Sequence, residues 1–346
     1  MPNLPAPLTS LNALEQAFAE GLAEMLEKHR GLGVTILVLA NAAFDAALWQ
    51  RLAAPLAERH AELAATITAT LRRGGRLDEP DDDVLVFLKL LAIGFERLQT
   101  TQHRRAGPWN LSFNPIRALR PPRMSGAKVA QPPPAFDPAG FHFSKPFLAR
   151  EVLWEGELAG KAARLLYNKF PFARLHGLLV PEPARELSQY LTPELHGWAW
   201  EVSAQAGAAV PGFCLAYNSY GALASVNHLH FQSFVRESPL PVQDAAFIHN
   251  GGELAYPLPC RCFTDMQAAW FHLDELHGRG TPYNLIYAAD CLHVLARAPQ
   301  GSRAQAAWNS GFAWSELAGA ITLFSREEFE RLNETEIATE LAKQAP

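Results

Sequence analysis

The sequence has few cysteines and no long hydrophobic run, and each absence narrows the range of functions. Its 346 residues include only four cysteines, which are too few and too scattered for a disulfide framework in a chain of this length. The mostly apolar runs, such as residues 34–40, fall far short of the roughly 20 residues that a membrane helix needs. The opening residues 1–5 lack the basic start and apolar core of a signal peptide. We therefore expect a soluble, cytoplasmic protein with no membrane partner.

An excess of positive charge is also missing. The formal net charge is −5 at pH 7 and the isoelectric point is about 6.2, whereas proteins that bind nucleic acid usually present a basic surface. We therefore expect no nucleic-acid partner. One segment departs from this average, because residues 97–136 contain no Asp or Glu but include Arg117, Arg120 and Arg123. This segment is either a solvated basic loop or part of a site for a small anionic ligand.

The chain divides into two regions that differ in the spacing of their apolar residues. Residues 1–105 show mostly helical spacing of apolar positions, and the rest shows short strand-like runs with turn signals between them and no internal repeat. Strands adjacent in sequence favour an antiparallel sheet. We therefore predict an α+β fold, with an antiparallel sheet flanked by helices in a domain over residues 106–346 and a mainly helical region before it. Helices are expected at 11–28, 42–73, 81–103, 184–206 (interrupted near Pro193), 265–277 and 325–342, and strands or strand-like runs at 33–40, 110–113, 151–158, 163–167, 176–180, 212–216, 228–236, 283–289, 292–296 and 320–324.

The most informative segment is Asn227-His228-Leu229-His230-Phe231-Gln232. Alternate side chains share one face of a strand, so His228, His230 and Gln232 are predicted to project together. A turn-forming stretch with small residues, 217–222, lies just upstream and would let a charged ligand approach the backbone. Two histidines at this spacing are compatible with structural burial, with metal binding or with catalysis. The flanking Asn227 and Gln232 favour catalysis.

The residue types in this segment suit chemistry at phosphorus. Neutral imidazole is a good nucleophile at neutral pH, and the phosphoramidate that it forms remains reactive enough to be discharged. A covalent mechanism needs one histidine in a fixed tautomer and donors placed where charge develops on the phosphate oxygens. We therefore predict His230 as the nucleophile, Gln232 as an amide donor to a phosphate oxygen, and the backbone near His228 as the group that fixes the ring.

The segment resembles the His-x-His-x-Gln active-site motif of the histidine triad superfamily, in its galactose-1-phosphate uridylyltransferase branch. The longer stretch 217–232 is similar to the GDP-hexose phosphorylases, and Asn114-Pro115-Ile116-Arg117 is similar, more distantly, to an element of the diadenosine tetraphosphate phosphorylases. The resemblance covers roughly residues 109–325 and implies a histidine-triad-like, two-half architecture. Further pieces that agree lie at 136–137, 141–143, 168–171, 176–181 and 253–257.

The resemblance implies a nucleotidyltransferase. Hydrolytic members of the superfamily have a histidine at the third motif position, whereas a glutamine is similar to the transferases and phosphorylases. The implied reaction is phosphorolysis of a nucleoside diphosphate hexose, with GDP-hexose favoured, to a nucleoside diphosphate and hexose 1-phosphate through a covalent nucleotidyl-histidine. Diadenosine tetraphosphate phosphorylase and hexose-1-phosphate uridylyltransferase are alternatives, and a nucleotide-binding regulatory protein is the alternative without catalysis. The implied site comprises the catalytic residues His230, His228 and Gln232 and the nucleotide or phosphate contacts Asn168, Lys169, His176, Asn218, Ser219, Gly221, Asn227 and Arg117.

A metal ion is the main competitor for the histidines. Uridylyltransferases of this branch often carry a structural metal with cysteine ligands, and a metal-dependent hydrolase is a third class of function. This chain lacks an amino-terminal cysteine pair, and Cys260-Arg261-Cys262 has the wrong spacing for a familiar zinc knuckle. We therefore predict no metal and no cofactor, with a nucleotide sugar and inorganic phosphate as small-molecule partners. The resemblance alone implies a homodimer.

Overall fold

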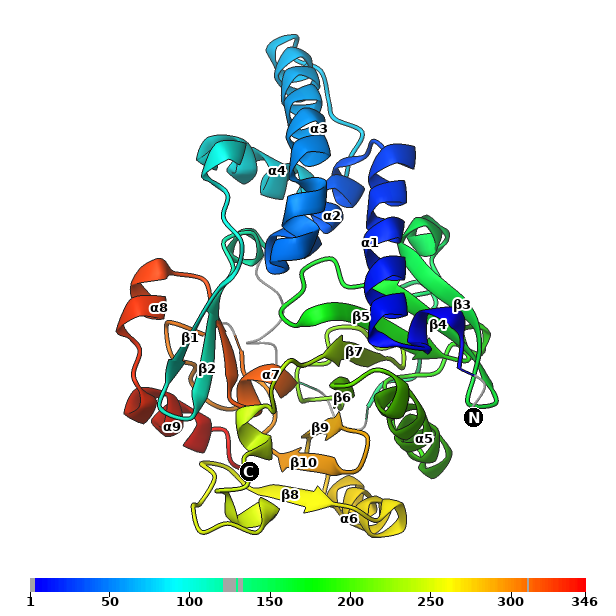
Figure 1. The fold of residues 1–346 in the computed structure, drawn as a ribbon, viewed down its shortest axis with the longest axis vertical. Helices are drawn as coiled ribbons and strands as arrows, with labels where there is room; N and C mark the ends of the chain where they lie inside the picture. The colour runs from blue at the N-terminus through cyan, green and yellow to red at the C-terminus, as the bar shows by residue number, and fades with distance from the viewer. Residues whose placement is uncertain (1–3, 121–128, 130–132, 310) are drawn as a thin grey trace.

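The computed structural model describes residues 4–120, 129, 133–309 and 311–346. Its N-terminal region is helical, with α1 (Leu11–Lys28), α2 (Leu32–Phe44), α3 (Ala46–Arg72) and α4 (Asp81–Ile93) packed above the sheets in Figure 1. Local signals explain these helices: Ser10 and Asp45 cap α1 and α3 with their side chains, and three aspartates begin α4 at the positive end of its dipole. Among the described residues, no helix combines the length and the apolar character that crossing a membrane requires.

Three expectations for this region were wrong. The run at 33–40 is not a strand but part of α2, whose residues are buried from Leu32 to Ala43. An element buried on all sides shows no polar face, so its period cannot be read from the sequence. Helix α4 ends at Ile93, well before residue 103, because Gly94 turns the chain with a φ of +87°. The helix expected over 42–73 begins only at Ala46, after the Asp45 cap, and residues 42–44 belong to α2.

The larger sheet has the strand order β3-β4-β5-β7-β6-β9-β10-β8, and every neighbouring pair is antiparallel. A smaller sheet has the order β1-β2-β11, in which β2 and β11 run parallel. The predicted α+β fold is confirmed, although β1, β8 and the parallel pair were not anticipated. The strands are β1 (Gln102–Ala106), β2 (Trp109–Phe113), β3 (Val152–Leu158), β4 (Lys161–Tyr167), β5 (Arg174–Pro181), β6 (Phe213–Asn218), β7 (Phe231–Val235), β8 (Cys260–Phe263), β9 (Tyr283–Tyr287), β10 (Leu292–Ala296) and β11 (Ala320–Leu323).

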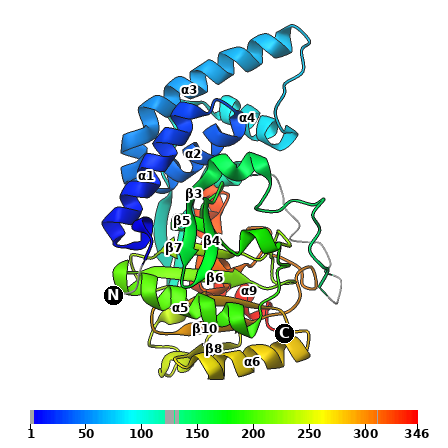
Figure 2. The same ribbon diagram turned by 90° about the vertical axis from the view of Figure 1, so that its right-hand side faces the viewer.

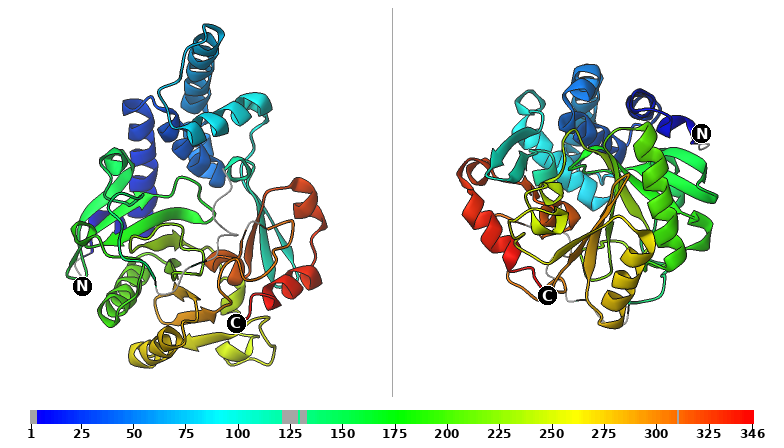
Figure 3. Two further views of the ribbon diagram at one scale, coloured as in Figure 1. Left: turned by 180° about the vertical axis from the view of Figure 1, so that it is seen from behind. Right: turned by 60° about the horizontal axis from the view of Figure 1, so that its bottom comes forward.

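The larger sheet separates two apolar cores, as the alternation along β6 shows. Leu215 and Tyr217 belong to a cluster that includes the N-terminal helices, α5 (Pro193–Ala209) and α6 (Met266–Gly278). Cys214 and Ala216 point the other way, into a cluster with β2, β11, α7 (Trp314–Leu317) and α9 (Glu334–Ala342). The side view and the view from behind show helices on either side of the sheet (Figures 2 and 3).

Two helices differ from the expected bounds. The helix predicted over 184–206 begins only at Pro193, where Thr192 provides the cap. The helix predicted over 325–342 is two helices, α8 (Arg326–Arg331) and α9, because Asn333 caps a new start by accepting a hydrogen bond from the Glu336 N–H. The division of the chain into domains at residue 105 stays a prediction. Side chains of α1 and α2 share one apolar cluster with the sheet, so the two regions pack against each other.

Candidate active site

The histidine motif lies where the chain enters β7, in the middle of the larger sheet. The strand predicted over 228–236 begins only at Phe231, so His228 and His230 precede it and Gln232 lies within it. The backbone of this segment bonds to a loop instead of a neighbouring strand. Leu229 N donates to Leu187 O over 2.7 Å, and His230 N donates to Gln189 Oε1 over 3.0 Å. Loop contacts at the end of a strand therefore hold the two histidines.

The ring of His230 is held in one tautomer. Its Nδ1 lies 2.8 Å from the backbone oxygen of His228 and 3.1 Å from Oε1 of Gln189. Both neighbours are acceptors, so Nδ1 carries the proton and Nε2 keeps its lone pair. Burial lowers the pKa of His230 to about 4, even though the hydrogen bond to His228 acts in the opposite direction. The ring is therefore neutral at pH 7, in the form that a nucleophile needs.

Gln189 was not anticipated from the sequence, although it contacts His230 at three atoms. Its side chain is almost fully buried, and its Nε2 donates to Asn218 O over 2.9 Å and to His230 O over 3.3 Å. It lies in an irregular segment between the short 3-10 helix η5 (Pro183–Arg185) and α5. A single glutamine in a loop gives no periodic signal in the sequence, so only the structure shows that it holds His230.

The side-chain amide of Gln232 has a fixed orientation. Its Oε1 accepts from Trp314 Nε1 over 2.9 Å and from His176 Nε2 over 3.0 Å. His176 donates through Nε2 because its Nδ1 accepts from the Phe172 N–H, and burial lowers the pKa of His176 to about 3, which keeps it neutral. Since Oε1 receives both donors, the Nε2 group of Gln232 is the donor that a ligand would meet. His176 and Trp314 thus position Gln232.

His228 holds the His230 ring through its backbone oxygen, and its own side chain contacts Phe143. Its Nδ1 accepts from Phe143 N over 3.0 Å, and its ring stacks on Phe143 and meets Phe136 edge-on. Its Nε2 is buried and has no hydrogen-bond partner within the part of the chain that the structure describes. Burial lowers the pKa of His228 to about 4. His228 is not among the described residues that line the cavity, although its ring and that of His230 both contact Phe143. That all three motif side chains project together stays a prediction.

A cavity of about 770 Å³ lies beside His230 and Gln232. Its size is in the range of pockets that hold small-molecule ligands. Several residues predicted from the sequence line it together: Arg117, Asn168, Lys169, Asn218, Asn227, His230 and Gln232. The fold therefore brings predicted residues from four separate segments to one site.

The cavity wall carries positive charge from two different elements. Asn114 Oδ1 accepts from the backbone N–H groups of Ile116 and Arg117, which makes the Asn-Pro-x-Arg element a tight turn. Arg117 donates to Phe170 O over 2.6 Å, and its guanidinium lies 4.3 Å from the centre of the Phe172 ring. Lys169 forms an ion pair with Asp83 of α4. Arg120 also lines the cavity, and Arg123 lies outside the described residues.

Two carboxyl groups in the cavity wall were not predicted. Burial raises the pKa of Glu151, at the end of the 3-10 helix η4 (Pro146–Glu151), to about 7, while nearby Lys169 opposes the shift. Burial also raises the pKa of Glu316, against the effect of Arg117. Isolated acidic residues in a sequence carry no sign of burial, so no sequence signal could have identified them. Glu151 is the group in the wall that would exchange a proton near neutral pH.

Four predicted residues have supporting positions. Ser219 Oγ accepts from Tyr283 N over 2.9 Å, which ties β6 to β9. Gly221 has a φ of +84°, as a turn requires. Neither is among the described residues that line the cavity. Asn218 accepts from Asn284 and from the Trp314 N–H, and Asn227 donates to Ala135 O and accepts from the Gln189 N–H. These side chains hold the loops around His230.

Comparison with known proteins gives relatives for the part of the chain that carries the motif. Residues 110–234 match the family model described as GDPGP1-like, N-terminal domain. GDP-D-glucose phosphorylase 1 of Homo sapiens is 39% identical over 119 residues, which are 32% of this chain and 30% of the human protein. GDP-L-galactose phosphorylase 1 of Arabidopsis thaliana is 32% identical over 143 residues, 36% of this chain and 31% of the plant protein. The chain thus spans about a third of the length of the curated relatives that it matches.

The fold has a counterpart among solved structures. The crystal structure of yeast Ap4A phosphorylase Apa2 aligns with a TM-score of 0.51 and 16% sequence identity, covering 78% of this chain and 95% of the yeast chain. At this identity the likeness concerns the fold alone. The resemblance inferred from the sequence is confirmed: the chain is similar to GDP-D-glucose and GDP-L-galactose phosphorylases, and the residues that match the GDPGP1-like family model include His228, His230 and Gln232.

Proposed function

We propose that the protein is a nucleotidyltransferase that phosphorolyses a nucleoside diphosphate hexose, with GDP-hexose favoured, through a nucleotidyl-His230 intermediate. One observation carries the proposal: the Nδ1 proton of His230 is held by two acceptors, which leaves Nε2 as a nucleophile beside a cavity of nucleotide-sugar size. The names of the human and plant relatives support a GDP-hexose as the substrate.

In the first step, Nε2 of His230 attacks the α-phosphorus of the nucleotide sugar. The N–P bond forms as the bond from the α-phosphorus to the bridging oxygen breaks, and hexose 1-phosphate leaves with the electron pair. The imidazole becomes positively charged, and the His228 carbonyl and Gln189 Oε1 stabilise this charge through the Nδ1 proton. The amide N–H of Gln232 donates to a non-bridging oxygen of the α-phosphate.

In the second step, an oxygen of inorganic phosphate attacks the same phosphorus. The N–P bond breaks, its electron pair returns to Nε2, and a nucleoside diphosphate leaves. Two in-line displacements retain the configuration at phosphorus and give ping-pong kinetics. The positive charges of Arg117 and Lys169 in the wall suit an anionic acceptor. Gln232 has no titratable group with which to activate water, so the site favours phosphate over hydrolysis.

The proposal is tested by intact mass spectrometry without phosphate. Incubation with GDP-glucose is expected to add one guanylyl group per chain and release glucose 1-phosphate, and added phosphate is expected to convert the adduct to GDP. His230→Ala abolishes the adduct, whereas His29→Ala, at the end of α1, keeps it. UDP-glucose, ADP-glucose and diadenosine tetraphosphate are run in parallel, and a preference for one of them would replace the substrate assignment.

Two outcomes would reject the enzyme proposal itself. The first is no turnover of any compound in the panel. The second is thermal stabilisation by nucleotides without a covalent adduct, which is the behaviour of a nucleotide-binding regulatory protein. An adduct that forms only with added zinc and disappears with a chelator would instead indicate metal-dependent chemistry.

We also infer that the working form is a cytoplasmic homodimer. The compartment rests on the features of the sequence, and the dimer rests on the resemblance. Light scattering on the purified protein is expected to give about twice the chain mass of 38.1 kDa. A mass equal to that of one chain at micromolar concentration would reject the dimer, and cell fractionation tests the compartment.

A further inference from the structure

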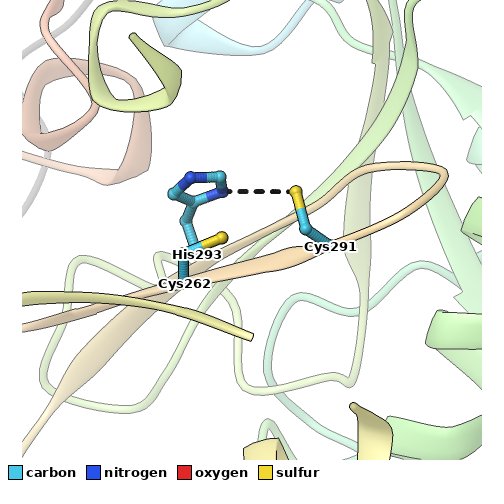
Figure 4. Close-up of side chains that lie close together, drawn as sticks. All are labelled: Cys262, Cys291 and His293. Carbon is cyan, nitrogen blue, oxygen red and sulfur yellow. Dashed lines mark hydrogen bonds between the residues drawn. The ribbon is translucent and has the colours of Figure 1, made fainter. Parts of the chain in front are cut away.

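A second cluster of reactive side chains lies at the β8 edge of the larger sheet. Figure 4 shows Cys262, Cys291 and His293 pointing toward one another, and one ligand atom from each lies within 4.8 Å of the others. These residues are not among the described residues that line the His230 cavity. Strands β6 and β9 separate β7 from β10, so the cluster is displaced by three strand spacings of about 5 Å each.

The register of the sheet brings these residues together. Cys262 of β8 is directly opposite His293 of β10 in an antiparallel pair. Cys291 immediately precedes β10, and its Sγ lies 3.8 Å from Nδ1 of His293. Cross-strand partners and neighbours two residues apart on one face are close enough for side-chain contact. The arrangement is therefore fixed by backbone pairing rather than by the rotamers of mobile loops.

The imidazole of His293 is oriented with its lone pair toward the cysteines. Its Nε2 lies 3.0 Å from Oδ1 of Asn250, and Asn250 is held by donating through Nδ2 to Val242 O and Asp244 O. Oδ1 is therefore an acceptor, so the His293 proton is on Nε2. The unprotonated Nδ1 lies 3.8 Å from Sγ of Cys291. A hydrogen bond from one ring nitrogen to an oxygen acceptor is the usual support of a metal-binding histidine.

A further imidazole lies next to this group. The ring of His249 is perpendicular to that of His293, with the ring centres 5.8 Å apart. Its Nε2 lies 2.7 Å from Val242 O, so Nδ1 of His249 is also unprotonated. Both histidines thus carry their protons on Nε2, and both are held by the same short segment before β8.

We propose that Cys262, Cys291 and His293 bind a thiophilic divalent cation, zinc above all. Two thiolates and one neutral imidazole match the ligand preferences of Zn²⁺ and disfavour Mg²⁺ and Ca²⁺, which prefer oxygen. Binding releases the two thiol protons to solvent. The ion would fasten the edge strand β8 to β10 across the segment that contains α6. The site is separate from the chemistry at His230.

The expectation of no metal came from the missing amino-terminal cysteine pair and from the Cys260-Arg261-Cys262 spacing. The three ligand-bearing residues instead come from two strands paired across the sheet, and Cys260 is not one of them. Cys260 is opposite Leu295 in the same strand pair and packs against an apolar cluster. It is two residues from Cys262 on the same strand, which makes Cys260→Ser a matched control.

The experiment measures bound metal in the full chain after expression with zinc and gel filtration. About one zinc ion per chain is expected, with less than a tenth as much in Cys262→Ser, Cys291→Ser and His293→Ala. Cys260→Ser is expected to keep the wild-type stoichiometry. Asn250→Ala removes the acceptor that orients His293, so its zinc affinity is expected to fall about 10–100-fold. Replacement of zinc by Co²⁺ is expected to give a thiolate charge-transfer absorption band in wild type and Cys260→Ser.

The wild-type protein alone can overturn the proposal, even if a variant does not fold. Absence of zinc together with absence of a cobalt–thiolate band would do so. A Cys262–Cys291 disulfide found by peptide mapping of the native protein would also do so, because it would consume both thiolates. Retention of one zinc ion per chain in folded Cys262→Ser or Cys291→Ser would show that the ion binds elsewhere.

Discussion

The ammonium group of Lys169 lies 2.5 Å from the carboxylate of Asp83, which joins the wall of the His230 cavity to the N-terminal helical region. Asp83 is buried in the first turn of α4, where the helix dipole favours a negative charge. Lys169 follows β4, in a segment that the sequence predicted to contact the nucleotide. The helices before residue 105 therefore help to hold a cation of the candidate site.

Asp83→Asn is expected to lower the free energy of unfolding by about 1–3 kcal/mol, because it leaves the partly buried Lys169 charge without its partner. Asp82→Asn is the matched control, since Asp82 is exposed in the same helical turn. Both changes remove one negative charge from the N-terminal end of the α4 dipole. Urea unfolding of the two variants checks the prediction. Equal losses in both would mean that the helix dipole, and not the pair with Lys169, accounts for the effect.

Gln189→Ala is expected to slow formation of the nucleotidyl adduct by about 10–100-fold, with a small change in KM. The variant removes one of the two acceptors that hold the Nδ1 proton of His230 and also the acceptor of its backbone N–H. We expect the rate of N–P bond formation to fall and substrate binding to stay the same, because Gln189 orients the nucleophile. Rapid-quench measurement of hexose 1-phosphate release separates this step from binding. Gln205→Ala, on the exposed face of α5, is the control, and a rise in KM alone would contradict a positioning role for Gln189.

The sequence was most successful where the signal is local. Helix α1 begins and ends where predicted, because its cap, Ser10, and its apolar stripe are formed by residues that are close together in the sequence. The pair His230 and Gln232 was identified correctly as facing one cavity, since two residues at this spacing need only the start of one strand.

The parts that the sequence missed depend on contacts between distant segments. Gln189 reaches His230 from a loop, Trp314 reaches Gln232 from α7, and Cys262 meets His293 through strand pairing. No periodic pattern in the sequence indicates any of these contacts. The start of β7 was placed too early for a related reason: Leu229 bonds to a loop and not to a neighbouring strand, and β7 begins only at Phe231.

Protonation of His230 is expected to lower the rate of adduct formation only as the pH drops through about 4. Burial lowers the pKa of His230 to about 4, so Nε2 remains unprotonated well below the usual range of histidine. The same shift contributes stability that is present above the ordinary pKa of 6.5 and is lost as the pH falls through about 4. Single-turnover rates with GDP-glucose check the profile, with circular dichroism at each pH to confirm that the protein is folded. A midpoint near 6.5 would show that His230 is solvated.

Glu151→Gln is expected to stabilise the protein at pH 8 and to change its stability little at pH 4.5. Burial raises the pKa of Glu151 to about 7, so the folded state favours the protonated carboxyl. The protonated carboxyl of Glu151 makes its full contribution to the free energy of unfolding below the unfolded pKa of 4.5. That contribution is lost as the pH rises through about 7. Glutamine resembles the protonated form at every pH, so the difference from wild type at pH 8 is expected to be about 1–3 kcal/mol. Urea unfolding at both pH values measures it, with Glu157→Gln on the exposed side of β3 as the control. The same difference at both pH values would show that the pKa of Glu151 is not raised in the folded protein, and that its position in the cavity wall is solvated.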